Sequence, residues 1–222
     1  MARLNLVFDF GAVLFAWQPR ALVREYFPER TATEEATASL AHSIFAHPDW
    51  QAFDAGTASM FETIERVQQR TGLPICQLRN LVHGIGERLA PLPSSVNVLR
   101  SLRERRDSYK GTGQDIKLFY LSNMPEPYAR ALELKHDFIG WFDDGIFSAD
   151  VKLAKPDAAI YALCTQRFGL QGADTVFIDD MLPNIAAARA HGWRALHLPV
   201  AEALEADLLN EIGLWPKEML HG

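Results

Sequence analysis

The sequence is poor in cysteine, in long apolar runs and in basic residues. Its two cysteines, Cys76 and Cys164, are too few for a disulfide framework, and neither lies at a metal-ligand spacing. Each falls within an apolar helical pattern, so we expect two buried thiols in a reducing compartment. The longest apolar runs are only as long as strands, and residues 1–10 lack the basic head and apolar segment of a signal peptide. These absences predict a cytoplasmic protein without a membrane span.

The charge balance argues against a nucleic-acid-binding surface. The chain has 22 Lys and Arg against 28 Asp and Glu, which gives a formal net charge of −6. Such a chain lacks the basic footprint that nucleic-acid binding requires, so any anionic substrate must be held by a few local groups. With 222 residues, of which 48% are hydrophobic, the chain is long enough for one sizeable core and a subdomain.

The chain begins with a strand, continues with a run of helices and then alternates between strands and helices. The stretch VFDFGAVL, residues 7–14, is typical of a buried strand that ends on a carboxylate, Asp9. Four amphipathic helical patterns follow without a strand between them, up to the Pro-rich boundary at residues 90–93. From Ile116 onward strands and helices alternate, which predicts a mostly parallel sheet with right-handed crossovers.

We therefore predict an α/β fold with two parts. Residues 1–14 and 94–222 form a three-layer, Rossmann-like core around a parallel sheet, and residues 15–93 form an inserted four-helix cap.

Polar clusters follow the expected strands at equivalent places. They are Asp9, Ser122-Asn123, Lys155 and Asp179-Asp180. Because parallel strands open at the same edge of a sheet, these groups can converge on one crevice. Each cluster also has a purely structural explanation, as a turn, a helix cap or a surface charge, and only the joint pattern favours a functional site.

The chemistry of these groups favours phosphoryl transfer. Carboxylates without cationic neighbours in sequence repel one another, and a hard divalent cation, most naturally Mg²⁺, reconciles them. A carboxylate left over can act as a nucleophile. The Ser122 hydroxyl and the Asn123 amide suit the oxygens of a phosphoryl group, and Lys155 adds a charge that neutralises developing negative charge. The pattern is that of a reaction through an aspartyl-phosphate.

The segments that carry these residues resemble the motifs of the haloacid dehalogenase superfamily in order and spacing: VFDFGAVL, LSN, ADVKLAKPDAAIY and FIDDMLPNIAAARAHG. The resemblance covers the whole chain, including a helical cap after the first motif. It is greatest for a bacterial subgroup with a DFG first motif, similar to the sugar-phosphate phosphatase YihX.

This resemblance implies a role for each of the polar residues. Asp9 would be the nucleophile, Ser122 and Asn123 would bind the transferring group, and Lys155 would orient nucleophile and phosphate. Asp180 would ligate Mg²⁺, with Asp179 as a second ligand or acting through water.

One position departs from the family pattern. Most phosphatases of the family carry a second Asp two residues after the nucleophile, which protonates the leaving oxygen and later activates water, whereas this chain has Gly11. Its backbone carbonyl can still coordinate the cation, but losing a general acid/base typically lowers the rate by ~10²–10⁴-fold. Three outcomes stay open: a phosphatase that obtains the proton elsewhere, a 2-haloacid dehalogenase, or a weakly catalytic phospho-ligand binder.

A dehalogenase fits Gly11 but not the acidic residues. The dehalogenases of the superfamily are metal-independent and carry uncharged Ser and Asn where this chain has Asp179 and Asp180. They also hold the substrate carboxylate with a cap Arg, for which Arg20 and Arg24 are only loose candidates. We therefore expect a Mg²⁺-dependent phosphatase of a small phosphorylated metabolite, present as a monomer or homodimer.

Overall fold

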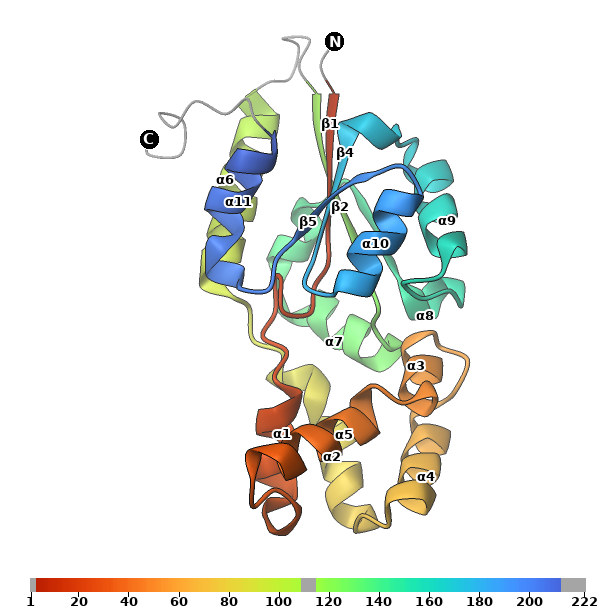
Figure 1. The fold of residues 1–222 in the computed structure, drawn as a ribbon. Coiled ribbons are helices and arrows are strands. Elements are labelled where there is room, and N and C mark those ends of the chain that lie inside the picture. The colour runs from red at the N-terminus through yellow and green to blue at the C-terminus, as the bar shows by residue number, and fades with distance from the viewer. Residues whose placement is uncertain (1–2, 109–114, 213–222) are drawn as a thin grey trace.

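A five-stranded parallel sheet forms the centre of the computed structural model, which describes residues 3–108 and 115–212 (Figure 1). The strands are β1 (Arg3–Phe8), β2 (Asp115–Ser122), β3 (Asp144–Phe147), β4 (Thr175–Asp179) and β5 (Arg194–His197). They lie in the order β3-β2-β1-β4-β5, and every neighbouring pair is parallel. The C-terminal ends of β1, β2 and β4 therefore open at one edge, on the central part of the sheet.

Helices cover both faces of the sheet. One face carries α6 (Pro93–Ser108), α7 (Glu126–Lys135) and α11 (Leu204–Ile212), and the other carries α9 (Ala158–Phe168) and α10 (Leu182–Ala190). The alternation of β1 produces this arrangement, because Leu6 and Phe8 enter the first core and Val7 enters the second. The three-layer α/β fold expected from the sequence is confirmed.

The helical insertion contains one more helix than the sequence predicts. Its helices are α1 (Pro19–Tyr26), α2 (Glu34–Phe45), α3 (Pro48–Asp54), α4 (Met60–Thr71) and α5 (Ile75–Arg88). The additional helix, α3, has seven residues, too few for a helical period to stand out. It begins with Pro48, and the His47 ring nitrogen accepts a hydrogen bond from the Asp49 N–H. A cap of four helices was thus an undercount.

Two extended linkers join these helices, called the cap below, to the sheet. The Ala16 N–H donates to the Ala90 carbonyl at 2.8 Å, and the Leu92 N–H donates to the Leu14 carbonyl at 2.8 Å. The paired linkers lie where the sequence places the boundary between cap and core. The exact division at residues 14/15 and 93/94 stays a prediction, and the termini of the expected core, residues 1–2 and 213–222, lie outside the described residues together with residues 109–114.

The cap also packs directly on the core. The Tyr128 hydroxyl of α7 donates to the Val82 carbonyl of α5 at 2.6 Å. The short helix α8 (Ser148–Val151) contacts α3 at the C-terminal edge of the sheet. None of the helices described has both the length and the apolar character that a membrane span needs.

Candidate active site

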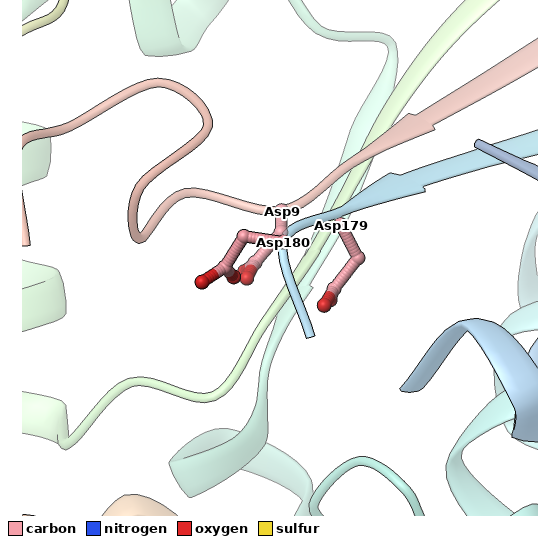
Figure 2. Close-up of side chains that lie close together, drawn as sticks. All are labelled: Asp9, Asp179 and Asp180. Atoms are coloured by element: carbon pink, nitrogen blue, oxygen red, sulfur yellow. The ribbon is translucent and has the colours of Figure 1, made fainter. Parts of the chain in front are cut away.

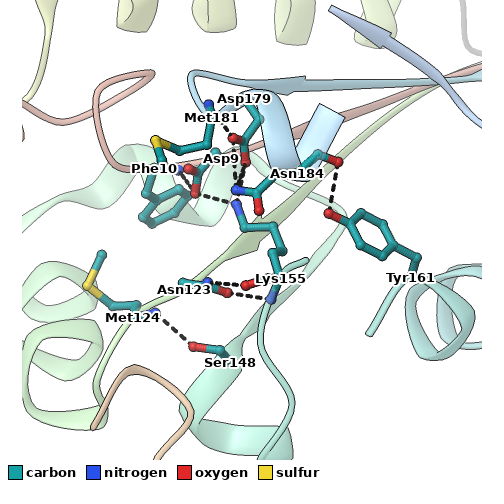
Figure 3. A network of polar contacts seen from close by, with 10 residues as sticks. All are labelled: Asp9, Phe10, Asn123, Met124, Ser148, Lys155, Tyr161, Asp179, Met181 and Asn184. Atoms are coloured by element: carbon teal, nitrogen blue, oxygen red, sulfur yellow. Dashed lines mark hydrogen bonds and ion pairs between the residues drawn. The ribbon is translucent and has the colours of Figure 1, made fainter. Parts of the chain in front are cut away.

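Side chains from separate segments meet at the C-terminal edge of the sheet. Asp9 directly follows β1, Ser122 ends β2 and Asp179 ends β4, while Lys155 lies between α8 and α9. Figure 3 shows Asp9, Lys155 and Asp179 in one polar network that also includes Asn123. The four clusters that the sequence singles out therefore lie together, although up to 171 positions separate them in the chain, counting from Asp9 to Asp180 (180 − 9).

Lys155 is a buried cation between two carboxylates. Its Nζ lies 2.9 Å from Asp9 Oδ1 and 2.6 Å from Asp179 Oδ2, and its side chain is 1% exposed. Burial lowers the pKa of Lys155, but the charges of Asp179 and Asp9 outweigh it and leave the pKa above its ordinary value. Lys155 is therefore a permanent positive charge at the site.

Asp9 is held in one orientation. Its Oδ1 accepts hydrogen bonds from the Phe10 N–H, at 2.7 Å, and from Lys155. Its own N–H donates to the Ile178 carbonyl at 2.9 Å, which ties the turn after β1 to β4. The second oxygen, Oδ2, has no hydrogen-bond partner among the described residues, and Asp9 lines the cavity described below. Oδ2 is therefore the atom that can attack a ligand.

Asp179 and Asp180 have different surroundings. Asp179 is fully buried, and its carboxylate accepts from Lys155, from the Met181 N–H at 2.8 Å and from Asn184 Nδ2 at 3.0 and 3.1 Å. Asp180 is half-buried and lines the cavity. Asp179 thus fixes Lys155, whereas Asp180 faces the cavity.

The three carboxylates carry more negative charge than Lys155 balances. Burial raises the pKa of Asp9 to about 7, against the opposing effect of Lys155, and Asp179 and Asp180 raise it further. Burial and the charge of Asp179 raise the pKa of Asp180 to about 6. Each of the three offers an oxygen within 4.8 Å of the others (Figure 2). Crowded oxygen donors with excess negative charge fit a hard divalent cation such as Mg²⁺.

Ser122 and Asn123 differ in the use of their side chains. The Ser122 hydroxyl is buried and has no hydrogen-bond partner, and Ser122 is not among the residues that line the cavity described below. Asn123 is engaged: its Nδ2 donates to the Lys155 carbonyl at 2.9 Å, and its Oδ1 accepts from the Lys155 N–H at 2.8 Å. The amide that the sequence suggests for phosphate binding here holds the loop that carries Lys155.

Sequence reasoning missed Asn184, which donates to both oxygens of Asp179 from the first turn of α10. The Tyr161 hydroxyl donates to the Asn184 carbonyl at 3.0 Å (Figure 3). The available signal was the position of an amide five residues after Asp179, one helical turn beyond the strand end. Tyr161 thus holds Asn184, and Asn184 holds the Asp179 carboxylate.

A cavity of about 210 Å³ lies between the polar cluster and the cap. Its polar lining at the core includes Asp9, Gly11, Asp180 and Lys155. The other polar residues of the lining are Asn123, Asn184 and Asp54. The rest of the wall is largely apolar and consists of Trp17, Phe45, Trp50, Ile85, Leu89, Met124, Pro125, Tyr128 and Met181. The Tyr128 hydroxyl is already donated to Val82, so this wall offers few polar groups.

The cap contributes one charged residue to the lining, Asp54 at the end of α3. Arg20 and Arg24 do not line the cavity: both are exposed, and Arg24 pairs with Glu34. Lys155 is the cationic side chain of the cavity among the described residues, and it is already occupied by two carboxylates.

Comparison with known proteins gives one matching family. The family described as haloacid dehalogenase-like hydrolase matches residues 6–192, most of the chain. The sesquiterpene phosphatase AstK of Aspergillus oryzae is 26% identical over 208 residues, which cover 93% of this chain and 95% of that protein. The fructose-1-phosphate phosphatase YqaB of Escherichia coli is 36% identical over 107 residues, covering 48% of this chain and 50% of its own.

Solved structures share the fold. A haloacid dehalogenase family enzyme of Bacteroides thetaiotaomicron, in complex with magnesium and inorganic phosphate, superposes with a TM-score of 0.64 at 18% identity. The superposition covers 87% of this chain and 93% of that enzyme.

Proposed function

This chain belongs to the haloacid dehalogenase-like hydrolase family, and from that premise we propose that it is a Mg²⁺-dependent phosphomonoesterase that works through an aspartyl-phosphate on Asp9. The observation that carries the proposal is the arrangement of Asp9. Its Oδ1 is fixed by Lys155 and the Phe10 N–H, while Oδ2 has no partner and Asp9 lines the cavity. A fixed carboxylate with one unengaged oxygen is arranged for nucleophilic attack.

Each neighbouring group has a part in this reaction. Asp9 Oδ2 attacks phosphorus, and Lys155 keeps Asp9 oriented while its charge offsets that of the phosphoryl oxygens. The Ser122 hydroxyl donates its free hydrogen bond to a phosphoryl oxygen. Asn123 fixes the Lys155 backbone, and Asp179, which is itself held by Asn184, fixes the Lys155 ammonium group.

Asp9, Asp180 and the Gly11 carbonyl are the groups that would hold Mg²⁺, with Asp179 behind them. Bound there, the cation offsets the negative charge of carboxylates and phosphoryl oxygens. The family enzyme of similar fold with magnesium and phosphate bound supports this choice of metal. The assignment to the subgroup with a DFG first motif remains part of the proposal.

The cavity favours a small phosphorylated metabolite whose alcohol part is apolar. Aromatic and aliphatic side chains line its outer wall, and described cationic groups other than Lys155 are absent from the lining. A sugar would leave several hydroxyl groups facing this wall without partners, which is unfavourable. The name of one relative, the sesquiterpene phosphatase, supports an apolar substrate, whereas that of the other, the fructose-1-phosphate phosphatase, indicates a sugar substrate.

A dehalogenase remains the main competitor because Gly11 supplies no proton and a halide leaving group needs none. The cavity weighs against it. A haloacid carboxylate requires a cation of its own, whereas Lys155 already serves Asp9 and Asp179, and Arg20 and Arg24 lie elsewhere.

Two parallel assays decide between these functions. Phosphate release from p-nitrophenyl phosphate is measured with Mg²⁺ and with EDTA, and chloride release from 2-chloropropionate is measured under both conditions. We expect phosphate release that EDTA abolishes, and no chloride release. Chloride release that survives EDTA, without phosphate release, would contradict the proposal. Asp9→Asn should abolish turnover while circular dichroism remains unchanged.

A substrate comparison tests the apolar preference. We expect kcat/KM for 3-methyl-2-butenyl phosphate to exceed that for fructose 1-phosphate by about tenfold or more, since burying an apolar group of this size contributes ~1.5–3 kcal/mol. Equal or reversed values would leave the phosphatase proposal standing and remove the apolar one.

A further inference from the structure

The proposed reaction lacks a proton donor at Gly11, although space for one exists there. Gly11 lines the cavity, and a Cβ built on it would have Trp17 Cβ, at 3.9 Å, as its nearest neighbour. Its backbone does not adopt the left-handed conformation that requires glycine. The backbone and the space at this position would therefore accept a carboxyl side chain. Because Gly11 has none, the proton for the leaving group has to come from another residue.

The opposite wall of the cavity carries a carboxyl group. Asp54 is the last residue of α3 in the cap and lines the same cavity as Asp9, Gly11 and Asp180. In a phosphoryl transfer the attacking and leaving oxygens lie roughly in line on either side of phosphorus. Because Asp9 attacks from the core, the leaving oxygen faces the cap, which is the side from which Asp54 enters.

Asp54 is held in place from two directions. The indole of Trp50, one turn earlier on α3 and 3% exposed, lies beside its carboxyl group and lowers its pKa as a hydrogen-bond donor. Its backbone carbonyl accepts a hydrogen bond from the Ser148 hydroxyl at the start of α8. The same hydroxyl accepts from the Met124 N–H at 2.8 Å, close to the end of β2. The core therefore positions a cap residue over the site.

The next residues of the cap dock on the core as well. The Lys152 ammonium group donates to the Gly56 carbonyl at 2.6 Å. A Cβ on Gly56 would lie 2.8 Å from the Ala149 carbonyl oxygen, and Gly56 has φ +64. Only glycine fits this approach of the cap to α8, so the contact that brings Asp54 to the cavity depends on it.

We propose that Asp54 is the general acid and base of the reaction and replaces, from the cap, the carboxyl group that Gly11 lacks. This rests on the proposed phosphatase function. In the first step Asp9 Oδ2 forms a bond to phosphorus, the bond between phosphorus and the alcohol oxygen breaks, and the proton of the Asp54 carboxyl passes to that oxygen. In the second step Asp54 takes a proton from water, the water oxygen attacks phosphorus, and the bond to Asp9 breaks to give inorganic phosphate.

The electrostatics of Asp54 suit an acid that starts protonated. Burial raises its pKa well above the ordinary value, and the charge of Asp9 raises it further, against opposing effects of Trp50 and Lys155. A protonated carboxyl group also avoids repelling the phosphate, and a raised pKa brings the group nearer to the operating pH of an enzyme.

Two phosphate esters with different leaving groups test the assignment. p-Nitrophenolate leaves without a proton, whereas the alkoxide of 3-methyl-3-butenyl phosphate requires one. For Asp54→Asn we expect a loss of ~10²–10⁴-fold in kcat for the alkyl ester. With p-nitrophenyl phosphate we expect a burst of about one nitrophenolate per enzyme, followed by slow turnover because water attack lacks its base.

Matched variants separate catalysis from folding. Glu65→Gln removes an exposed cap carboxyl on α4 and should leave both substrates unaffected. Trp50→Phe keeps the Asp54 carboxyl but removes its hydrogen bond, and should lower kcat for the alkyl ester by about tenfold. In the Asp54→Asn background, Gly11→Asp should restore part of the alkyl activity, which a merely structural role of Asp54 would not allow.

Three results would overturn the proposal. They are an Asp54→Asn enzyme with wild-type rates, equal losses on both esters without a burst, and no restoration by Gly11→Asp. If wild-type protein releases no phosphate from either ester, the proposed function fails instead, so the two failures are distinguishable.

Discussion

The ammonium group of Lys155 lies 2.6 Å from Asp179, and both side chains are almost completely buried, at 1% and 0% exposure. Asp9 is the second anionic partner of the same cation, at 2.9 Å. Removing one member of a buried ion pair leaves the other without compensation, and such removal typically destabilises by ~3–5 kcal/mol. The triad therefore serves stability and orientation together.

Lys155→Met should show both effects. We expect the free energy of unfolding in EDTA to fall by about 3–5 kcal/mol and phosphate release to be lost, because the three carboxylates then repel one another. Urea denaturation followed by circular dichroism measures the first effect. Lys117→Met is the control, since it breaks only a partly exposed pair with Asp143, for which ~0–1 kcal/mol is expected. Equal losses of unfolding free energy in the two variants would show that the buried triad stabilises the protein no more than a partly exposed ion pair does.

Asp179 and Asp180 should separate in their responses to Mg²⁺. Asp180 faces the cavity, so Asp180→Asn is expected to remove most of the rise in thermal midpoint that saturating Mg²⁺ produces. That rise corresponds to ~2.7 kcal/mol at a hundredfold excess over Kd. Asp179→Asn should instead lower the midpoint already in EDTA, because Lys155 and Asn184 lose their charged partner. Differential scanning fluorimetry with and without Mg²⁺ distinguishes the two patterns, and identical patterns would remove the distinction.

The positions of Asp9, Lys155, Asp179 and Asp180 could be predicted because the site follows from the topology. Parallel strands open at one edge, so residues that follow strands converge whatever their separation in sequence. The same logic does not reach the Asn123 side chain, whose partners are the backbone groups of Lys155, 32 positions away. The local sequence around an asparagine does not show whether its side-chain amide will bind a ligand or a backbone group of the protein.

Asp54 could not be predicted for a different reason. Its sequence neighbourhood, HPDWQAFDAG, contains a seven-residue helix without a clear period, and the proposed role of Asp54 depends on how the cap is placed over the core. That placement is set by tertiary contacts, such as those of Ser148 and Lys152 with the backbone of residues 54 and 56. The sequence shows that Gly11 supplies no proton donor, but only the packing of the cap shows where another carboxyl group lies.

The two cysteines should differ in reactivity, contrary to the expectation that both are buried. Cys164 is buried in α9, where burial raises its thiol pKa above the ordinary value, whereas Cys76 is exposed near the start of α5. Only one thiol per chain is therefore expected to react with Ellman's reagent in native protein, and two in urea. The variant Cys76→Ser should show none in the native state. Rapid reaction of both thiols in native protein would contradict the packing of α9 against the sheet.

Asp54 should also influence stability as a function of pH. A carboxyl group whose pKa rises on folding stabilises the folded chain below its unfolded value, near 3.8, and loses this contribution as pH rises through the folded value. The charged groups that act on the pKa of Asp54 are Asp9 and Lys155 from the core, and Trp50 lowers it as a neutral neighbour. The free energy of unfolding of wild type should therefore fall relative to that of Asp54→Asn between about pH 4 and pH 8. At about pH 8 the variant should be the more stable protein and the less active one, the relation expected when a catalytic group is held in a place that destabilises its charge.

Urea titrations in EDTA at pH 4 and pH 8 measure this difference in the free energy of unfolding, with Glu65→Gln as the control that should follow wild type throughout. A difference that does not change with pH would mean that the Asp54 carboxyl is as well solvated in the folded chain as in the unfolded one, and that it is not poised to exchange a proton with a ligand.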